Sequence, residues 1–389
     1  MQNKIYIEDM GCDSRALDAG RFTKYFLANG FKSINNPKYA DYILFITCAF
    51  ISSKESYAIK RIKQLQEYRG ELIVGGCLKG INKEELDKNF QGFSFYTARC
   101  EEIDNKFPDF KIKFSDIPDI NLVSSKGIGL FIKEYISTIR FDLSYVKRFL
   151  SSYKRRVLNK PYFIRISWGC INKHCSFCVI RRAVGNLKSK PLGQCVAEFK
   201  RALEKGYNNI VLVGDNVGAW GIDLELAFPD LIEELLKIKG AYNVQIDDFH
   251  SRWIVQYADR LVPIFRSGRI KYLKTPLQSA SDRILTAMNR GHTISQLRES
   301  LCKIKEAFPK LNLCTHIIVG FPSETESEFE ETLNFVKEIG FNMVYIFSYS
   351  KNPHLKLPAD IENLENSEKI LKEREHKSVR FFVRNKIAC

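Results

Sequence analysis

The first 80 residues repeat one pattern three times: a β-rich run of residues that ends shortly before a cysteine. Amphipathic helical stretches separate these runs, so strand and helix alternate along the chain. The β-rich runs span residues 4–8, 41–47 and 71–75, and the helical stretches span residues 14–29 and 53–68. Because parallel strands need a crossover connection, which is usually a helix, this alternation predicts a doubly wound parallel sheet of the α/β class.

Each β-rich run is followed, directly or within a few residues, by a cysteine: Cys12, Cys48 or Cys77. The carboxyl ends of parallel strands lie at one edge of the sheet, and doubly wound folds bind their ligands outside that edge. We therefore expect the three thiols to meet there and to form a metal-binding cage.

Strand and helix candidates alternate again from residue 161 onward. The strand candidates span residues 162–167, 209–214, 242–247, 270–275, 312–320 and 343–349, and the helix candidates span 197–205, 230–239, 254–265, 295–308 and 326–339. Six βα units predict an incomplete (βα)6 barrel, whose functional residues belong at the carboxyl ends of the strands. A charged stretch at residues 362–386 is expected to form a last helix.

The alternation weakens between residues 82 and 160, apart from a possible further unit near 93–98 and basic stretches at 145–147 and 154–156. We therefore place the boundary between two domains in this region. The expected segments are an N-terminal α/β domain at residues 1–135, a linker at 136–160, the barrel at 161–350 and a charged helical tail at 351–389.

The loop after the first barrel strand, SWGCINKHCSFCVI, holds Cys170, Cys175 and Cys178. Three closely spaced thiolates bind a cubane iron–sulfur cluster and leave one iron without a protein ligand. A zinc site is the alternative, because His174 would complete a set of three cysteines and one histidine. Eleven cysteines in a chain that does not start with a signal-peptide pattern favour metal binding or catalysis over disulfide bonds.

The chain carries a formal net charge of +15, from 60 Lys and Arg residues against 45 Asp and Glu residues. A basic surface favours polyanions such as RNA or an anionic membrane face, but a proteome rich in Lys and Asn would give the same charge. No apolar run is long enough to predict a membrane-spanning helix. We expect a cytoplasmic protein with no membrane partner.

Taken together, the cysteine contexts MGCDSRALDAG, FITCAF and VGGCLKG and the barrel triplet resemble the methylthiotransferase family of the radical S-adenosylmethionine (SAM) superfamily. Four later segments are similar to family signatures in the same order: GNLKSKPL, IVLVGDNVGAWGIDL, PLQSASDRILTAMNRGHT and HIIVGFPSETESEFEETLNFV. Two cysteine triplets and four ordered matches make the resemblance specific, and it covers most of the chain.

The resemblance implies two [4Fe–4S] clusters, one on Cys170, Cys175 and Cys178, and one on the three N-terminal cysteines. The barrel cluster binds SAM, and one electron from an external donor splits the sulfonium bond to give a 5′-deoxyadenosyl radical. That radical removes a hydrogen atom from an unactivated carbon of the substrate, and the second cluster supplies a methylated sulfur to the carbon radical. The cofactors do this chemistry, while the protein aims the radical and excludes water.

Six further residues are candidates for holding SAM or substrate because of their place in the matching segments. They are Asp215, Asn216, Gln278, Ser279, Gly320 and Glu324. The alternative is that they are turn and helix-cap residues, which Asn, Asp and Ser favour in any protein.

Other polar residues near these segments have weaker patterns. Arg181 and Arg182 follow the barrel cysteines and either contact an anionic group of the substrate or form solvated surface charge. Four histidines and the five other cysteines are expected to be packing or surface residues; they are His250, His292, His316, His354, Cys100, Cys195, Cys302, Cys314 and Cys389.

The chain departs from the family at the barrel triplet, which is Cys-x4-Cys-x2-Cys where the family usually has three residues in the first gap. One extra residue adds little to the entropic cost of closing the loop, so we still expect the cluster. After the barrel, the tail leaves no room for the small β-barrel, the TRAM domain, that family members usually carry.

By the family resemblance, the leading hypothesis is that the chain methylthiolates an adenosine of transfer RNA. A peptide or ribosomal-protein side chain is the second hypothesis, which the expected lack of a TRAM domain favours. A non-enzymatic RNA-binding protein with structural metal sites is the third.

Overall fold

A computed structural model describes residues 2–10, 12–119, 161–171, 175–352, 354–355, 357 and 368–389. Its N-terminal part contains a four-stranded sheet in the order β2-β1-β3-β4, and every pairing in it is parallel. The strands are β1 (Lys4–Asp9), β2 (Lys32–Ser33), β3 (Tyr42–Thr47) and β4 (Glu71–Gly76). The three predicted strands are therefore confirmed, and β2 adds a short edge strand.

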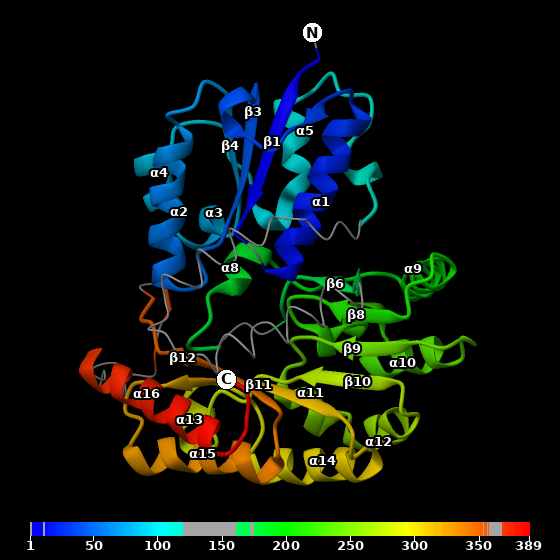
Figure 1. The fold of residues 1–389 in the computed structure, drawn as a ribbon, viewed down its shortest axis with the longest axis vertical. Helices are drawn as coiled ribbons and strands as arrows, with labels where there is room; N and C mark the ends of the chain where they lie inside the picture. The colour runs from blue at the N-terminus through cyan, green and yellow to red at the C-terminus, as the bar shows by residue number, and fades with distance from the viewer. Residues whose placement is uncertain are drawn as a thin grey trace.

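Helices cover both faces of this sheet, as Figure 1 shows. Successive residues of a strand point to opposite faces. Leu44 of β3 shares a core with Phe22, whereas its neighbour Phe45 shares a separate core with Ile62. Phe22 belongs to α1 (Asp13–Ala28) and Ile62 to α2 (Ser52–Leu65). The sheet is therefore doubly wound, as the sequence predicts.

The region after β4 contains short helices rather than another full strand. They are α3 (Leu78–Ile81), α4 (Lys83–Asn89), α5 (Ile103–Lys106) and the 3-10 turns Thr97–Glu102 and Phe114–Asp116. The possible further unit near residues 93–98 is limited to one parallel bridge, between Val74 and Ser94. The predicted linker, 136–160, and both basic stretches lie outside the described residues.

The second part of the chain forms a six-stranded parallel sheet in the order β12-β11-β10-β9-β8-β5. Its strands are β5 (Tyr162–Arg165), β8 (Asn209–Val213), β9 (Asn243–Ile246), β10 (Ile270–Lys274), β11 (Asn312–Val319) and β12 (Met343–Ser348). Strands follow one another in sequence order across the sheet, as in an incomplete (βα)6 barrel. A short antiparallel pair, β6 (Ser167–Trp168) and β7 (Lys188–Ser189), flanks β5.

Helices pack on one side of this sheet, and their apolar faces form the largest core of the molecule. They include α9 (Leu192–Glu204), α10 (Phe228–Leu236), α11 (Ser251–Gln256), α12 (Ala258–Arg266), α14 (Ile294–Ala307) and α15 (Glu326–Ile339). Helix α8 (Ile180–Val184) packs instead against α3 of the N-terminal part, and α13 (Asp282–Ala287) belongs to a small separate core. The single helix predicted at 254–265 is two helices, because the backbone leaves helical dihedrals at Tyr257. The ring of Tyr257 stacks on Trp253 at that break.

The C-terminal residues complete the edge of the barrel sheet. Helix α16 (Glu368–Arg384) packs beside α15 and β12 (Figure 1), and the residues after it return to β12. There the backbone N–H of Val344 donates to the carbonyl of Ala388 at 2.7 Å. The predicted charged helix is confirmed over α16. Among the described helices, none combines the length and the apolar character that crossing a membrane requires.

Candidate functional site

The loops that follow β1, β3 and β4 lie side by side at the carboxyl edge of the N-terminal sheet, and they carry Cys12, Cys48 and Cys77. The backbone N–H of Cys77 donates to the carbonyl of Thr47 at 2.9 Å, and the N–H of Cys48 contacts the Met10 sulfur at 3.2 Å. The structure therefore brings these loops together as the sequence predicts.

A glycine permits the close approach of two of these loops. Gly76 has a positive φ of 94°, and a Cβ atom on it would lie 2.3 Å from the backbone nitrogen of Thr47. Any other residue would be strained at this φ and would push β4 away from β3. Gly76 thus allows Cys77 to lie beside the loop that carries Cys48.

Electrostatic interactions link the three N-terminal thiols. Burial raises the pKa of the Cys77 thiol, the neighbouring guanidinium of Arg15 lowers it, and the Cys48 and Cys12 thiols raise it again. Cys77 is 3% exposed and Arg15 is 2% exposed. Three mutually interacting thiols beside one buried cation form a set of donors that favours a bound metal centre.

The barrel loop brings Cys170, Cys175 and Cys178 together after β6. The N–H of Cys178 donates to the carbonyl of Cys175 at 3.3 Å, and the N–H of Cys170 donates to the carbonyl of Gly185 at 3.1 Å. Gly169, just before Cys170, has a φ of 74°, and a Cβ there would lie 1.9 Å from the carbonyl oxygen of Asn186. A side chain at this position would displace the loop. Residues 172–174, with His174 of the zinc alternative, lie outside the described residues.

Arg290 is the buried cation of the barrel triad. The pKa of the Cys178 thiol is raised to about 12, mainly by burial; the Cys175 and Cys170 thiols contribute to the rise, and Arg290 opposes it. Burial also lowers the pKa of Arg290 itself to about 10, although the three thiols favour its charged form. Each triad is thus accompanied by one buried arginine, which neither residue pattern nor spacing had indicated.

Both donor sets consist of cysteines, whose thiolates are the usual protein ligands of iron–sulfur clusters. In the part of the chain that the structure describes, no three His, Cys, Asp or Glu side chains are spaced as ligands of one metal ion. A cubane cluster distributes its thiolates over separate irons, so its cysteines need not approach that closely. Iron bound by these cysteines would favour the thiolate over the thiol and would thus oppose the effect of burial on their pKa values.

The adjacent residues Asp215 and Asn216 follow β8; Asp215 contacts both triad regions, and Asn216 contacts the barrel triad. A carboxylate oxygen of Asp215 accepts from the N–H of Gly169 at 2.9 Å, and the other lies 3.9 Å from the Arg15 guanidinium. The amide of Asn216 lies 3.5 Å from the Cys170 sulfur. These two residues therefore contact both the N-terminal part, through Arg15, and the barrel cysteine loop, through Gly169 and Cys170.

Gln278 and Ser279 lie just past β10, where the sequence places them. The Oε1 atom of Gln278 is buried and has no hydrogen-bond partner among the described residues, and its backbone is held by His316 and Ile318 of β11. The hydroxyl of Ser279 instead accepts from the N–H of Ser281 at 3.2 Å. Gln278 is thus the better candidate for a ligand contact, and Ser279 has a partner within its own turn.

Gly320 and Glu324 belong to one turn after β11, and this turn is fixed by α16. Glu324 accepts from the N–H of Gly320 at 2.7 Å and forms an ion pair with Arg374 at 2.8 Å. The side chain of Glu324 is 1% exposed and that of Arg374 is 7% exposed. Arg374 was not among the predicted residues, because a single arginine in a charged helix gives no sign that it is buried.

Replacing Glu324 with glutamine removes the closer of the two carboxylates that pair with the buried Arg374 and leaves only Glu326, at 3.4 Å. We expect Glu324→Gln to lower the free energy of unfolding by about 3–5 kcal/mol, the usual cost of breaking a buried ion pair. Lys377→Gln is the matched control, because Lys377 lies on the same helix but pairs with Glu326 at the surface. Denaturant titration should show a loss of at most about 1 kcal/mol for the control. Equal losses would contradict the buried role of Glu324.

The structure gives most of the secondary candidates packing roles. Arg181 donates to the carbonyl of Cys170 at 3.0 Å and braces the barrel loop, whereas Arg182 is exposed. His250 caps α11, and His316 packs against Tyr345 and Phe347. The five other cysteines lie outside both triads: Cys195 and Cys314 are buried, Cys100 and Cys389 partly buried, and Cys302 exposed.

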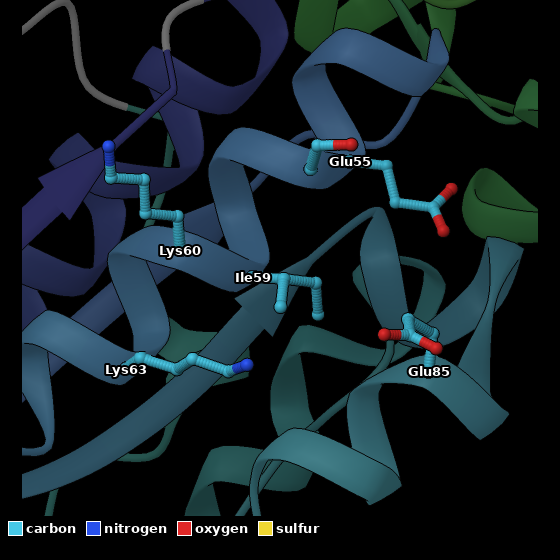
Figure 2. Close-up of a pocket in the computed structure, with 6 residues that line it drawn as sticks. Glu55, Ile59, Lys60, Lys63 and Glu85 are labelled. Atoms are coloured by element: carbon cyan, nitrogen blue, oxygen red, sulfur yellow. The ribbon is translucent and has the colours of Figure 1, made fainter.

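A hollow on the N-terminal part, shown in Figure 2, is distinct from the cysteine loops. It lies between α2 and α4, has a volume of about 510 Å³ and contains no predicted site residue. Its lining is Glu55, Ser56, Ile59, Lys60, Lys63 and Glu85. Because both charge signs and few apolar groups line it, it resembles ordinary solvated surface.

Comparisons with known proteins agree with this geometry. Residues 164–336 match the radical SAM superfamily, and residues 4–97 match the uncharacterized protein family UPF0004. The tRNA-2-methylthio-N(6)-dimethylallyladenosine synthase of Acinetobacter baylyi is 30% identical over 383 residues, covering 95% of this chain and 76% of the relative. The chain belongs to the radical SAM methylthiotransferase family.

Another relative of this methylthiotransferase is named for a different substrate. The ribosomal protein uS12 methylthiotransferase RimO of Chlamydia pneumoniae is 29% identical over 372 residues, covering 92% of this chain and 74% of the relative. Membership of the family makes the protein an enzyme and implies SAM and a [4Fe–4S] cluster. The non-enzymatic hypothesis is therefore not retained.

Solved structures show the same fold. The radical SAM methyltransferase TsrM from Kitasatospora setae has a TM-score of 0.60 at 10% identity, over 90% of this chain and 75% of that chain. The cobalamin-dependent enzyme OxsB has a TM-score of 0.56 at 13% identity, over 99% of this chain and 56% of that chain. The pairing of an N-terminal parallel sheet with a radical SAM barrel is thus confirmed as a fold.

Proposed function

We propose that this methylthiotransferase converts a C–H bond into a C–SCH3 bond on an adenosine of transfer RNA. The observation that carries the proposal is the dipeptide Asp215–Asn216, which contacts the Arg15 region of one cysteine triad and the Cys170 sulfur of the other. Sulfur insertion requires that both centres serve one substrate, and this proximity supports that requirement.

In the proposed enzyme, the barrel triad holds one [4Fe–4S] cluster and the N-terminal triad holds a second. Once bound, the clusters supply the electron that splits SAM and the sulfur that is transferred. Arg15 and Arg290 offset the negative charge of the thiolates, and the buried Oε1 of Gln278 accepts a hydrogen bond from SAM or substrate. The electron itself comes from an external donor. With RNA or ribosomal protein as substrate, the reaction takes place in the cytoplasm.

Two features support RNA over protein as the substrate. The net charge of +15 suits a partner with a phosphate backbone. The A. baylyi relative is named for a tRNA adenosine, and a 26% identical relative from Pyrococcus horikoshii is named a probable threonylcarbamoyladenosine tRNA methylthiotransferase. A base of single-stranded RNA can be splayed out of its stack, which would bring an adenine to the barrel mouth.

The test is anaerobic reconstitution with iron and sulfide, followed by reaction with SAM, a reductant and unmodified transfer RNA. Mass spectrometry of the digested RNA should show an adenosine heavier by one methylthio group in place of hydrogen. Formation of 5′-deoxyadenosine without any modified nucleoside, in RNA from a deletion strain of the source organism, would contradict the RNA assignment.

A ribosomal-protein side chain is the second candidate substrate, and the similarity to RimO favours it. Salt distinguishes the two, because RNA binding releases counterions from phosphates. For a protein that contacts about six to ten phosphates, we expect RNA affinity to fall by roughly 1,000-fold or more between 50 and 200 mM salt. A titration in which RNA affinity hardly falls with salt, while a uS12 peptide binds tightly at both salt concentrations, would favour the protein substrate.

A further inference from the structure

Four charged side chains form a buried network where the N-terminal part meets the barrel. They are Arg15 and Asp18 of α1, Arg165 of β5, and Asp215 after β8; we call them the ion-pair clamp. Arg165 contacts Asp18 at 2.7 Å, and Arg15 lies 3.1 Å from Asp18 and 3.9 Å from Asp215. The side chains are between 1% and 11% exposed. Two cations and two anions thus balance inside the interface.

The clamp is attached to both cysteine loops through the backbone. Arg165 donates to the carbonyl of Ser14 at 2.5 Å, two residues past Cys12. Asp215 accepts from the N–H of Gly169, the residue directly before Cys170. A movement of α1 relative to the barrel would therefore break contacts that begin within a few residues of each triad.

Ion pairs of this kind fix orientation more than they stabilise the interface. Replacing a buried ion pair with apolar groups is often neutral for stability, whereas removing one partner leaves an uncompensated charge. Apolar packing is already present, because Leu17 of α1 packs against Val211 and Val213 of β8. Apolar contacts tolerate small shifts, but the hydrogen bonds of Arg165 do not. The clamp thus restrains the orientation of α1 relative to the barrel, which the apolar contacts alone would allow to shift.

We propose that the ion-pair clamp holds the two cysteine triads at the separation that sulfur transfer needs. This rests on the proposed methylthiotransferase function. Asp215 is then a positioning residue: its oxygens contact Gly169 and Arg15 and act on the chemistry through the two loops. When reacting groups are misplaced by about 1 Å, the rate of the reaction can fall roughly 100-fold. Loosening the clamp should therefore uncouple SAM cleavage from sulfur insertion.

The test compares Arg165→Gln and Asp215→Asn with Arg298→Gln, a matched control whose ion pair with Glu338 lies at the surface between α14 and α15. Hydrogen–deuterium exchange is measured first, on protein purified without clusters. The N–H of Ala16 donates to the carbonyl of Cys12. Its exchange rate should be about tenfold higher than in wild type in both clamp variants and should be the same as in wild type in the control.

The reconstituted variants are then assayed for 5′-deoxyadenosine and methylthiolated product. Both clamp variants should form at least about tenfold more 5′-deoxyadenosine per product, with a KM for SAM within about twofold of wild type. Arg165→Lys, which keeps the charge, should restore part of the coupling. An unchanged ratio in either clamp variant overturns the proposal. So does a raised KM for SAM at Asp215→Asn alone, which would indicate direct contact with SAM.

The two proposals fail in different ways. If the wild-type enzyme cleaves SAM but methylthiolates nothing, the proposed function fails, and the exchange measurement still reports on the clamp. If exchange at Ala16 is the same in all variants, the clamp does not restrain α1 and its proposed role is wrong, whatever the substrate.

Discussion

We expect Cys175→Ala to abolish SAM cleavage, which is the largest effect of any substitution considered. Cys175 and Cys178 are joined through a backbone hydrogen bond in the barrel loop, and Cys170 shares their electrostatic environment. With one of three thiolates missing, the cluster that delivers the electron is not held. Replacing a residue that hydrogen-bonds to a metal ligand lowers metal affinity or activity roughly 10- to 100-fold. Loss of a ligand itself should therefore lower the rate of SAM cleavage by at least about 100-fold.

The measurement is 5′-deoxyadenosine formed per minute under reductant, together with iron content after anaerobic reconstitution. Cys302→Ala is the matched control, because Cys302 is an exposed thiol on α14, away from both triads. The control should bind as much iron as wild type and cleave SAM at the same rate. Substantial cleavage by Cys175→Ala would show that the barrel triad is not the SAM site.

The elements that sequence alone predicted are those determined by local pattern. Strands such as β8 and β12 are short apolar runs, β10 alternates apolar and polar residues, and each long helix has an apolar face, so their existence follows from local pattern. The edge positions of the cysteines follow from the rule that parallel strands end together. Neither inference required knowledge of which strand pairs with which.

The parts that sequence did not predict depend on contacts between distant residues. Arg165 and Asp18 are 147 positions apart, and Arg374 and Glu324 are 50 apart. On sequence alone, a charged residue on a helix is expected at the surface, since burial of a charge is costly without a partner. The partner becomes visible only when the sheet order is known. Asp215 is predicted to hold SAM or substrate, and its contact with Arg15 was not predicted for the same reason.

The substitution Cys12→Ala should distinguish the functions of the two triads. Its thiol lies in the N-terminal loop cluster with Cys48 and Cys77, whereas the barrel triad is carried by a separate loop. We therefore expect SAM cleavage within about threefold of wild type, because the barrel cluster and its pocket are intact. Methylthiolation should fall by at least about 100-fold, because one ligand of the sulfur-supplying centre is lost.

The decisive measurement is the ratio of methylthiolated product to 5′-deoxyadenosine in the same reaction mixture. Wild type and Cys302→Ala should give the same ratio, Cys12→Ala a ratio near zero, and Cys175→Ala neither product. Iron content should fall by about half in Cys12→Ala, because one of two proposed clusters is lost while the other is retained. If Cys12→Ala methylthiolates substrate normally, the transferred sulfur does not come from the N-terminal cage, and the contact of Asp215 with Arg15 serves only to join the two parts of the chain.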